Sequence, residues 1–282
     1  MIKLCAFADE ATTDLMGQIQ ALKRNDIEYL ELRSINGKNV KDFTISEAET
    51  YEKILSENGI RVWSIGSPLG KVDIHTDFEQ YQQTVRKLCK IANIFKTDKI
   101  RMFSFHNAYD DKELVFSYLR KMVEIAKEYG IELYHENEKD VYGDIAERVA
   151  EIMENVSGLR YIYDPANYIQ CNQKADKTLE MFHNKTDYFH IKDVIEETGE
   201  LVPAGYGSGK IEELINRITT DKVLTMEPHL AVFDGYASID NTKMKHKFHF
   251  ANKQEAFDVA VHTIKELLKK CGYKEVDKAF IK

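Results

Sequence analysis

Four apolar segments in the second half of the chain each end in a side chain that can ionise or bind a metal. These side chains are Glu136, Asp164, His190 and Glu227. Successive side chains of a β-strand point to opposite faces, so Tyr188, His190 and Lys192 share one face of the segment 188–192. A histidine and a lysine two residues apart on one face favour a functional site over a hydrophobic core.

Three carboxylates and one imidazole form a mixed set of oxygen and nitrogen donors. Such a set suits one divalent manganese, cobalt, zinc or magnesium ion with positions left open for substrate oxygens. An ion of this kind polarises a bound carbonyl and lowers the pKa of the adjacent C–H group. A neighbouring carboxylate can then remove or return that proton. The four residues therefore predict a divalent-metal site that promotes proton transfer.

Each of the four residues also has an ordinary structural interpretation. A carboxylate at a strand end often caps a helix or is solvated, and a histidine in a strand often belongs to the core. Burying charge is costly unless the charge is paired or bound to a metal. Four such residues after four consecutive strands therefore favour a common site.

The residues around this set alternate between β-rich and helical patterns along the whole chain. Strands are expected at 2–8, 29–33, 61–65, 99–105, 131–136, 159–164, 188–192 and 223–227, and helices at 11–24, 46–57, 77–95, 112–129, 145–155, 175–183, 211–218 and 254–271. Eight strand–helix units predict an α/β fold, a (β/α)8 TIM barrel spanning 1–282 as a single domain. A doubly wound sheet is the rival, but 6–14 contains no glycine and so lacks the dinucleotide-binding fingerprint. In a barrel, the carboxyl ends of the strands carry the active site.

The composition narrows the class of partner. A net charge of −8 argues against a general nucleic-acid binder. No apolar run reaches the roughly 18 residues that span a bilayer, and the N-terminal segment turns acidic too early for a secretory signal. The four cysteines are far apart and are expected to be reduced thiols. We therefore expect a cytoplasmic protein with a small-molecule substrate and neither nucleic-acid nor membrane partners.

The motifs around the four residues resemble those of the xylose isomerase-like TIM barrel superfamily, and specifically its sugar phosphate isomerase/epimerase group. The matching motifs are Glu136-Asn137, Asp164-Pro165-Ala166-Asn167, His190-Ile191-Lys192-Asp193 and Glu227. The resemblance covers nearly the whole chain in order. It implies a sugar or sugar phosphate substrate and one divalent ion held by all four residues. It also implies that Glu136 and Glu227 are the catalytic acid/base pair, on opposite faces of the substrate carbon.

Two positions depart from the ketose 3-epimerases of this superfamily. Asn167 stands where those enzymes commonly have a histidine, and Glu196 where they have an arginine. Both of those residues contact substrate oxygens in the relatives, which argues against 3-epimerisation of ketohexoses in particular. Lys192 follows the wider group's pattern and is expected to bind a substrate hydroxyl, carboxylate or phosphate. Its structural alternative is a salt bridge with Asp193 or Glu196.

Three further residues are weaker substrate-binding candidates. His229 shares a face with Glu227, His106 closes the fourth strand, and Trp63 lies in the third strand, where it could stack on a sugar ring or pack in the core. The basic segment 243–249 could cover the pocket or form a subunit contact. A homo-oligomer is left open, since relatives are often dimers or tetramers.

Three other functions are alternatives to an isomerase or epimerase. A dehydratase of an inosose-like cyclic ketone would use the same proton abstraction, followed by loss of a β-hydroxyl group. An AP-endonuclease-like phosphodiesterase would need up to three metals and more histidines, including one near 65–67, where this chain has Ile-Gly-Ser. A sugar-binding barrel without activity would not need all four ligands.

Overall fold

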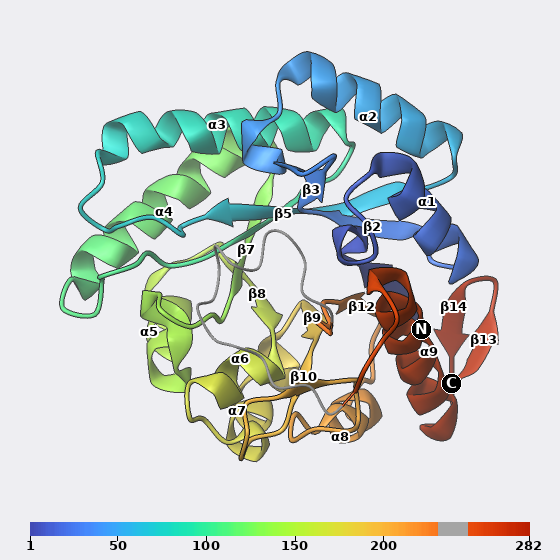
Figure 1. Cartoon of the computed structure of the whole chain (residues 1–282). Helices are drawn as coiled ribbons and strands as arrows, with labels where there is room; N and C mark the ends of the chain where they lie inside the picture. The colour runs from blue at the N-terminus through green and yellow to red at the C-terminus, as the bar shows by residue number, and fades with distance from the viewer. Residues whose placement is uncertain (231–247) are drawn as a thin grey trace.

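The computed structural model describes residues 1–230 and 248–282 and shows eight parallel strands closed into a barrel (Figure 1). The barrel strands are β1 (Ile2–Ala6), β2 (Tyr29–Leu32), β5 (Arg61–Leu69), β6 (Lys99–Met102), β7 (Glu132–Glu136), β8 (Arg160–Tyr163), β9 (Tyr188–Ile191) and β12 (Lys222–Met226). Each strand pairs in parallel with the next, and β12 pairs with β1 to close the ring. The expected (β/α)8 barrel is confirmed.

Helices surround the strands on the outside of the ring (Figure 1). They are α1 (Leu15–Arg24), α2 (Ile45–Glu57), α3 (Phe78–Ile94), α4 (Lys112–Glu128), α5 (Ala146–Asn155), α6 (Pro165–Gln170), α7 (Ala175–Phe182), α8 (Ile211–Asn216) and α9 (Lys253–Lys270), with short 3-10 turns at Ala8–Glu10, Val40–Asp42, Tyr142–Asp144 and His183–Lys185. In the described parts of the chain, no helix is both long and apolar enough to cross a membrane.

Local chemistry sets several helix boundaries. Thr44 and Glu47 form a reciprocal capping box at the start of α2, in which each side chain bonds the other residue's backbone N–H. Asp14 accepts a hydrogen bond from the Gly17 N–H at the start of α1. Gly130 follows α4 with φ of +71°, a conformation that costs glycine little.

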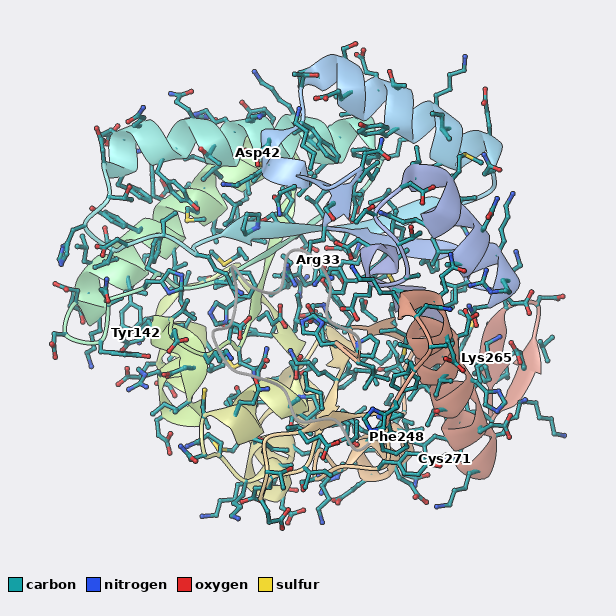
Figure 2. The ribbon with its side chains drawn as sticks, viewed as in Figure 1. Arg33, Asp42, Tyr142, Phe248, Lys265 and Cys271 are labelled. Atoms are coloured by element: carbon teal, nitrogen blue, oxygen red, sulfur yellow. The ribbon has the colours of Figure 1, made fainter. Side chains whose placement is uncertain are left out.

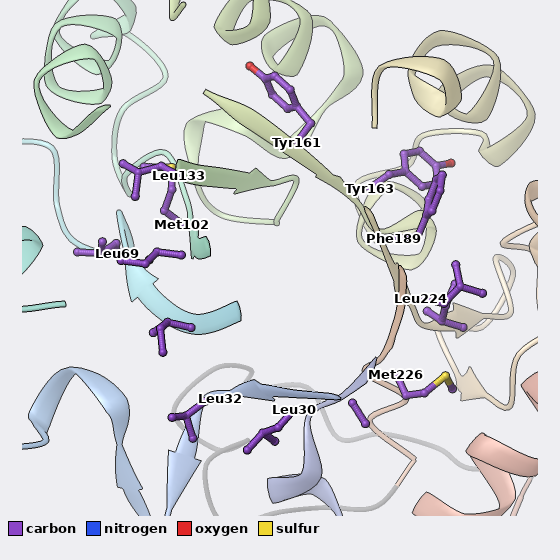
Figure 3. Packing of buried hydrophobic residues seen from close by; sticks show 14 of the residues in the cluster. Leu30, Leu32, Leu69, Met102, Leu133, Tyr161, Tyr163, Phe189, Leu224 and Met226 are labelled. Carbon is purple, nitrogen blue, oxygen red and sulfur yellow. The ribbon is translucent and has the colours of Figure 1, made fainter. Parts of the chain in front are cut away.

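The barrel strands separate two kinds of side chain by simple alternation. Figure 3 shows apolar side chains such as Leu30, Tyr163 and Leu224 pointing away from the barrel centre, toward the helices. The residues between them face inward. At the N-terminal end of the strands these inward residues form an aromatic and aliphatic floor, made of Cys5, Tyr29, Trp63, Tyr134, Ile162, Tyr188 and Val223.

The structure differs from the expected elements in several places. The strand expected at 99–105 ends at Met102. The strand expected at 61–65 continues through Gly66 and Pro68 to Leu69, because Ser67 Oγ bonds the Arg101 carbonyl oxygen where the register of β5 against β6 shifts. Helix α6 was not expected. The chain also ends in a hairpin, β13 (Lys274–Val276) and β14 (Ala279–Ile281), whose second strand pairs antiparallel with the start of β1.

Two further two-stranded ladders lie at the carboxyl ends of barrel strands: β3 (Ser34–Ile35) with β4 (Lys38–Asn39), and β10 (Asp193–Val194) with β11 (Leu201–Val202). Most of the basic segment 243–249 lies outside the described residues. Of its described part, Phe248 packs edge-on against Tyr206, with ring centroids 5.4 Å apart.

Candidate metal centre

The four residues singled out from the sequence meet at the carboxyl end of the barrel. One donor atom from each of Glu136, Asp164, His190 and Glu227 lies within 4.8 Å of the others, and all four residues are buried. His190 Nδ1 lies 2.9 Å from Glu136 Oε1 and 3.2 Å from Glu227 Oε2. The spacing is that of donors able to share one cation.

The two carboxylate oxygens of Asp164 have different surroundings. Oδ1 accepts a hydrogen bond from the Asn167 N–H and thereby caps α6, in which Pro165 occupies the first turn. Oδ2 is buried and accepts no hydrogen bond from the described residues, although Lys192 Nζ lies 3.0 Å away. The cap interpretation of this aspartate and the ligand interpretation are therefore compatible.

The unsatisfied oxygens test whether a cation fits this cluster. Asp164 Oδ2 and Glu227 Oε2 are both buried without a hydrogen bond in the part of the chain that the structure describes. Leaving a buried charged acceptor unsatisfied is costly. Glu227 Oε2 lies 3.2 Å from His190 Nδ1, and Asp164 belongs to the same group of possible ligands. A divalent ion with oxygen and nitrogen ligands fits this donor set.

Glu31, on β2, holds the other nitrogen of His190. Its Oε2 lies 3.1 Å from His190 Nε2, and its Oε1 accepts a hydrogen bond of 3.1 Å from the Tyr188 hydroxyl. A carboxylate bonded to Nε2 places the proton there and leaves the Nδ1 lone pair for a metal. Glu31 thus selects the tautomer in which His190 can act as a ligand.

Arg33 follows β2 and lies near the centre of the ring of strands (Figure 2). It binds the Asp9 carboxylate through two hydrogen bonds of 2.8 and 2.9 Å. The same guanidinium reaches Glu10 Oε1 at 3.3 Å and Glu227 Oε1 at 3.0 Å. Arg33 therefore fixes the outer oxygen of Glu227 and leaves Oε2 facing His190.

Arg101, on β6, plays a similar part for Glu136. Its Nη1 lies 3.2 Å from Glu136 Oε2 and 3.6 Å from Glu227 Oε1, and its Nη2 donates to the Gly66 carbonyl oxygen. Arg33 and Arg101 both lie over the Phe7 ring, at 4.5 and 4.9 Å from its centroid. Two buried arginines therefore orient the two glutamates.

Among the described residues, the permanent charges of this buried region do not balance. Six carboxylates and three permanent cations are buried here and are linked to one another directly or through His190: Asp9, Glu10, Glu31, Glu136, Asp164 and Glu227, against Arg33, Arg101 and Lys192. Unpaired buried charge is strongly unfavourable. A divalent cation would remove most of this negative excess.

Burial and the neighbouring charges raise the pKa values of some residues in the cluster and lower those of others. Burial opposes a charge on His190, but Glu136 and Glu31 outweigh it and raise the His190 pKa well above its usual value. Burial raises the pKa of Asp164 to about 6, although Lys192 favours the charged form. Burial also opposes the charge of Glu227, but Lys192 and His190 lower its pKa well below the ordinary range.

Lys192 lies at the cluster, as its spacing from His190 predicts. It pairs with Asp164, so the alternative salt bridges with Asp193 and Glu196 are wrong. Asp193 instead accepts hydrogen bonds from the backbone N–H groups of Val194, Gly205, Gly207 and Gly209. A side chain at Gly207 would come within 2.3 Å of that carboxylate, which explains the glycine-rich loop. Glu196 is exposed and pairs with Lys174.

Asn167, which replaces the histidine of the ketose 3-epimerases, contacts Glu136 directly. Its Nδ2 lies 3.3 Å from Glu136 Oε1 and 2.9 Å from the Asn137 carbonyl oxygen. The amide therefore supports a cluster residue and the strand end on which it lies.

His229 also lies at this end of the barrel, held by Glu10. The Glu10 carboxylate contacts His229 Nδ1 at 2.6 Å and accepts from the His229 backbone N–H at 2.9 Å, while φ of His229 is +48°. His229 Nε2 lies 3.6 Å from Glu227 Oε1. Glu10, Glu227 and His229 form a second group with metal-ligand spacing. Arg33 already binds both of its carboxylates, so we assign it no ion.

Trp63 is not brought to this site. It is the third residue of the nine-residue β5 and therefore lies in the floor, against Tyr29 and Tyr188. There it borders a cavity of about 370 Å³ at the opposite end of the barrel. The expected stacking of Trp63 on a substrate at the metal centre is therefore wrong, because a strand's first residues and its last lie at opposite ends of the barrel.

His106 lies in the loop after β6, where its Nδ1 is 2.7 Å from the Asp140 carbonyl oxygen. No contact found for it in the described chain reaches the four-residue cluster. Its proposed role in substrate binding therefore stays a prediction.

Sequence reasoning missed the charged residues inside the earlier strands, above all Glu31, Arg33 and Arg101. The sequence contains a pattern that could have indicated these residues. In Leu30-Glu31-Leu32-Arg33 and Ile100-Arg101-Met102, charged and apolar residues alternate in strands expected to be buried on both faces. An inward charge in a closed barrel must be paired, so this alternation indicates a polar interior.

Comparisons with known proteins agree with the fold and the motifs. The family model described as xylose isomerase-like TIM barrel matches residues 19–271. No curated protein matches the chain by sequence.

Solved structures match the chain over nearly its whole length. The probable 3-DHS dehydratase AsbF of Bacillus anthracis is 15% identical with a TM-score of 0.71, and the match covers 94% of this chain and 99% of that one. IolI, solved with a zinc atom, is 14% identical with a TM-score of 0.72, covering 95% and 98%. A D-tagatose 3-epimerase-like protein is 16% identical with a TM-score of 0.71, covering 96% and 98%. The TM-scores establish a shared fold, and at these low identities they show no more than that.

Proposed function

Because the chain belongs to the xylose isomerase-like TIM barrel family, we propose that it is a metal-dependent isomerase or epimerase of a keto-sugar or sugar phosphate. The reaction is proton transfer next to a carbonyl. One observation carries the proposal: Glu136, Asp164, His190 and Glu227 converge with metal-ligand spacing at the carboxyl end of a barrel. That end is where TIM barrel enzymes hold their active sites.

The ion would be held by these four residues, and when bound it would polarise the substrate carbonyl and acidify the adjacent C–H group. The chain itself supplies the proton acceptor and donor. Glu136 and Glu227 are the two candidates, because each keeps one oxygen toward His190 and has its second oxygen held by an arginine. Lys192 would hydrogen-bond a substrate oxygen.

A deuterium wash-in experiment tests this proposal. The protein is loaded with Mn²⁺, Co²⁺, Zn²⁺ or Mg²⁺ and incubated in D2O with a panel of ketoses, ketose phosphates and inososes. We expect exchange at the carbon next to the carbonyl for at least one class, and loss of exchange after chelation. Absence of exchange across the panel with every metal would contradict the proposal.

Dehydration of an inosose-like ketone is the second candidate, and the Glu10–His229 pair favours it. Elimination needs a general acid for the departing hydroxyl group, in addition to the base that removes the C–H proton. His229, oriented by Glu10 and 3.6 Å from Glu227, is a third acid/base group at the same end of the barrel. One fold neighbour, AsbF, is described as a probable dehydratase.

Product analysis separates the two candidates. An isomerase or epimerase returns a product of unchanged mass apart from deuterium, whereas a dehydratase releases water and gives a product lighter by one water. Loss of elimination with retained deuterium exchange in His229→Asn would identify His229 as the acid. A phosphodiesterase is not favoured, because only one of the two acidic groups seen in the described chain is available to a metal.

A further inference from the structure

Three cations lie on one side of the cluster, within β6 or just after β5 and β9. These residues, which we call the cationic arc, are Lys71, Arg101 and Lys192. Lys71 Nζ and the Arg101 guanidinium lie over the same Phe103 ring, at 4.3 and 5.0 Å from its centroid. Lys71 pairs with Glu138 at 2.7 Å, and Glu138 also interacts electrostatically with Lys192.

The partners of the arc are mainly the residues that would hold the ion. Lys192 is 5% exposed, and its ammonium has one ion-pair partner in the described chain, Asp164 Oδ2, without the geometry of a hydrogen bond. Arg101 is also 5% exposed. Its Nη1 pairs with Glu136 and Glu227, and its Nε is buried without a hydrogen-bond partner among the described residues. Both cations thus keep unused donors.

A bound divalent ion would change the charge balance on this side. Among the described residues, the arc faces four carboxylates, those of Glu136, Glu138, Asp164 and Glu227, so without an ion these carboxylates exceed the arc by one charge. With two further positive charges from the ion, the excess on this side becomes one positive charge. The negative excess stays on the opposite side, where Asp9, Glu10 and Glu31 outnumber Arg33.

We infer that the cationic arc is a subsite for an oxyanion, so that the substrate of the proposed reaction is a keto-sugar bearing a carboxylate or phosphate group. The inference rests on the proposed function for the identity of the sugar part. Charge-assisted hydrogen bonds from a lysine and an arginine are the donors that carboxylates and phosphates prefer. The hydroxyl-bearing end of the same substrate faces Glu10 and His229, whose groups accept and donate hydrogen bonds.

Calorimetric binding to the metal-loaded protein tests the subsite with three matched probes. D-fructose, D-fructose 6-phosphate and D-fructuronate differ at C6, which carries a hydroxyl, a phosphate or a carboxylate. We expect one or both anions to bind at least about tenfold more tightly than fructose. The anion that binds more tightly shows whether the subsite prefers a phosphate or a carboxylate.

Variants of the arc show whether that preference arises there. In Lys192→Met and Lys71→Met the preference for the anion falls by about tenfold, while Lys177→Met, which removes an exposed lysine elsewhere, leaves it unchanged. Metal affinity is measured on each variant, so that a lost ion is not mistaken for a lost subsite.

The inference is overturned if neither anion binds better than fructose, or if the preference survives in Lys192→Met. Deuterium exchange, recorded on the same samples, separates this outcome from failure of the proposed function. Exchange without an anion preference refutes the subsite alone. An anion preference without exchange of any panel substrate refutes the proposed reaction and leaves the subsite in place.

Discussion

The two ends of the barrel interior are built from opposite chemistry on the same eight strands. The N-terminal end is an aromatic floor, in which the rings of Trp63 and Tyr188 meet edge-on with centroids 6.1 Å apart. At the C-terminal end, the described residues include a cluster of six buried carboxylates and three buried cations around His190. On β9 the change takes two residues, from Tyr188 in the floor to His190 in the cluster.

The difference shows how a closed barrel divides stability from chemistry. Aromatic packing at the floor needs no partner outside the chain. The charged end is different, because Asp164 Oδ2 and Glu227 Oε2 are buried there without a hydrogen-bond partner among the described residues. Glu31 joins the two ends, since it bonds both the Tyr188 hydroxyl and His190 Nε2. Substitutions at the charged end should therefore change metal binding and deuterium exchange, whereas substitutions at the floor should change the free energy of unfolding.

The largest effect is expected at the charged end. Glu136→Gln and Glu227→Gln each remove a proton acceptor while keeping size and shape. Deuterium exchange should fall by about 10²–10⁴-fold, the usual contribution of a general acid or base. The metal-free variants should stay folded, and Glu227→Gln should lose stability, because the lowered pKa of Glu227 means that its charge stabilises the folded chain. Exchange at the wild-type rate in either variant would refute its assignment.

Trp63→Ala tests the aromatic floor. It should lower stability and leave metal binding and deuterium exchange nearly unchanged. Removing this ring leaves a cavity against Tyr29 and Tyr188, and a loss of about 3 kcal/mol in the free energy of unfolding is expected. Metal affinity and the rate of exchange should stay within about twofold of wild type at a temperature where the variant is folded. Chemical denaturation and calorimetry provide the two readouts. Loss of metal binding in the folded variant would show that the two ends are coupled.

Glu31→Gln tests the link between the ends. The amide keeps the size of the side chain but removes the charge that holds the Nε2 proton of His190. We expect metal affinity to fall by about 10–100-fold, as for other partners of metal-ligating histidines. Tyr188→Phe is the matched control, because it removes the hydroxyl bond to Glu31 and leaves the carboxylate on His190. An equal loss in both variants would point to general disruption of the barrel.

The effect that is smallest at neutral pH concerns a histidine outside the barrel interior. His135 is fully buried, both of its ring nitrogens lack partners in the described chain, and burial lowers its pKa to about 3. The unfolded chain takes up this proton near pH 6.5, whereas the folded chain does so only near pH 3. The free energy of unfolding should therefore decrease as the pH is lowered from about 6.5 to about 3, by up to about 1.4 kcal/mol per pH unit.

Urea denaturation between pH 7 and pH 4 checks this expectation on the metal-free protein. His135→Leu should flatten the pH dependence by the equivalent of one proton. His262→Leu, at an exposed position, serves as the control and should leave it unchanged. A slope unaffected by the His135 substitution would mean that this side chain is not held neutral in the folded protein.

The features that sequence predicted well were those that a local pattern encodes. Strand–helix alternation gave the eight barrel units, and the parity of His190 and Lys192 within one strand placed both on the inner face. The tail hairpin was missed because its second strand is stabilised by pairing with β1, which lies 276 to 278 residues earlier in the chain. Trp63 was misplaced because the aromatic character of a residue does not reveal its depth along the barrel axis.

By itself, the sequence determined the barrel and the four donors, because periodicity and strand-end chemistry are properties of neighbouring residues. Only the tertiary structure decided which groups hold those donors: Glu31 on His190, Arg33 on Glu227 and Arg101 on Glu136. These pairs join residues between 35 and 194 positions apart. The physical reason is the closed ring of strands, in which β12 pairs with β1 and β1 with β2, so that inward-facing charges far apart in the sequence meet at one end of the barrel.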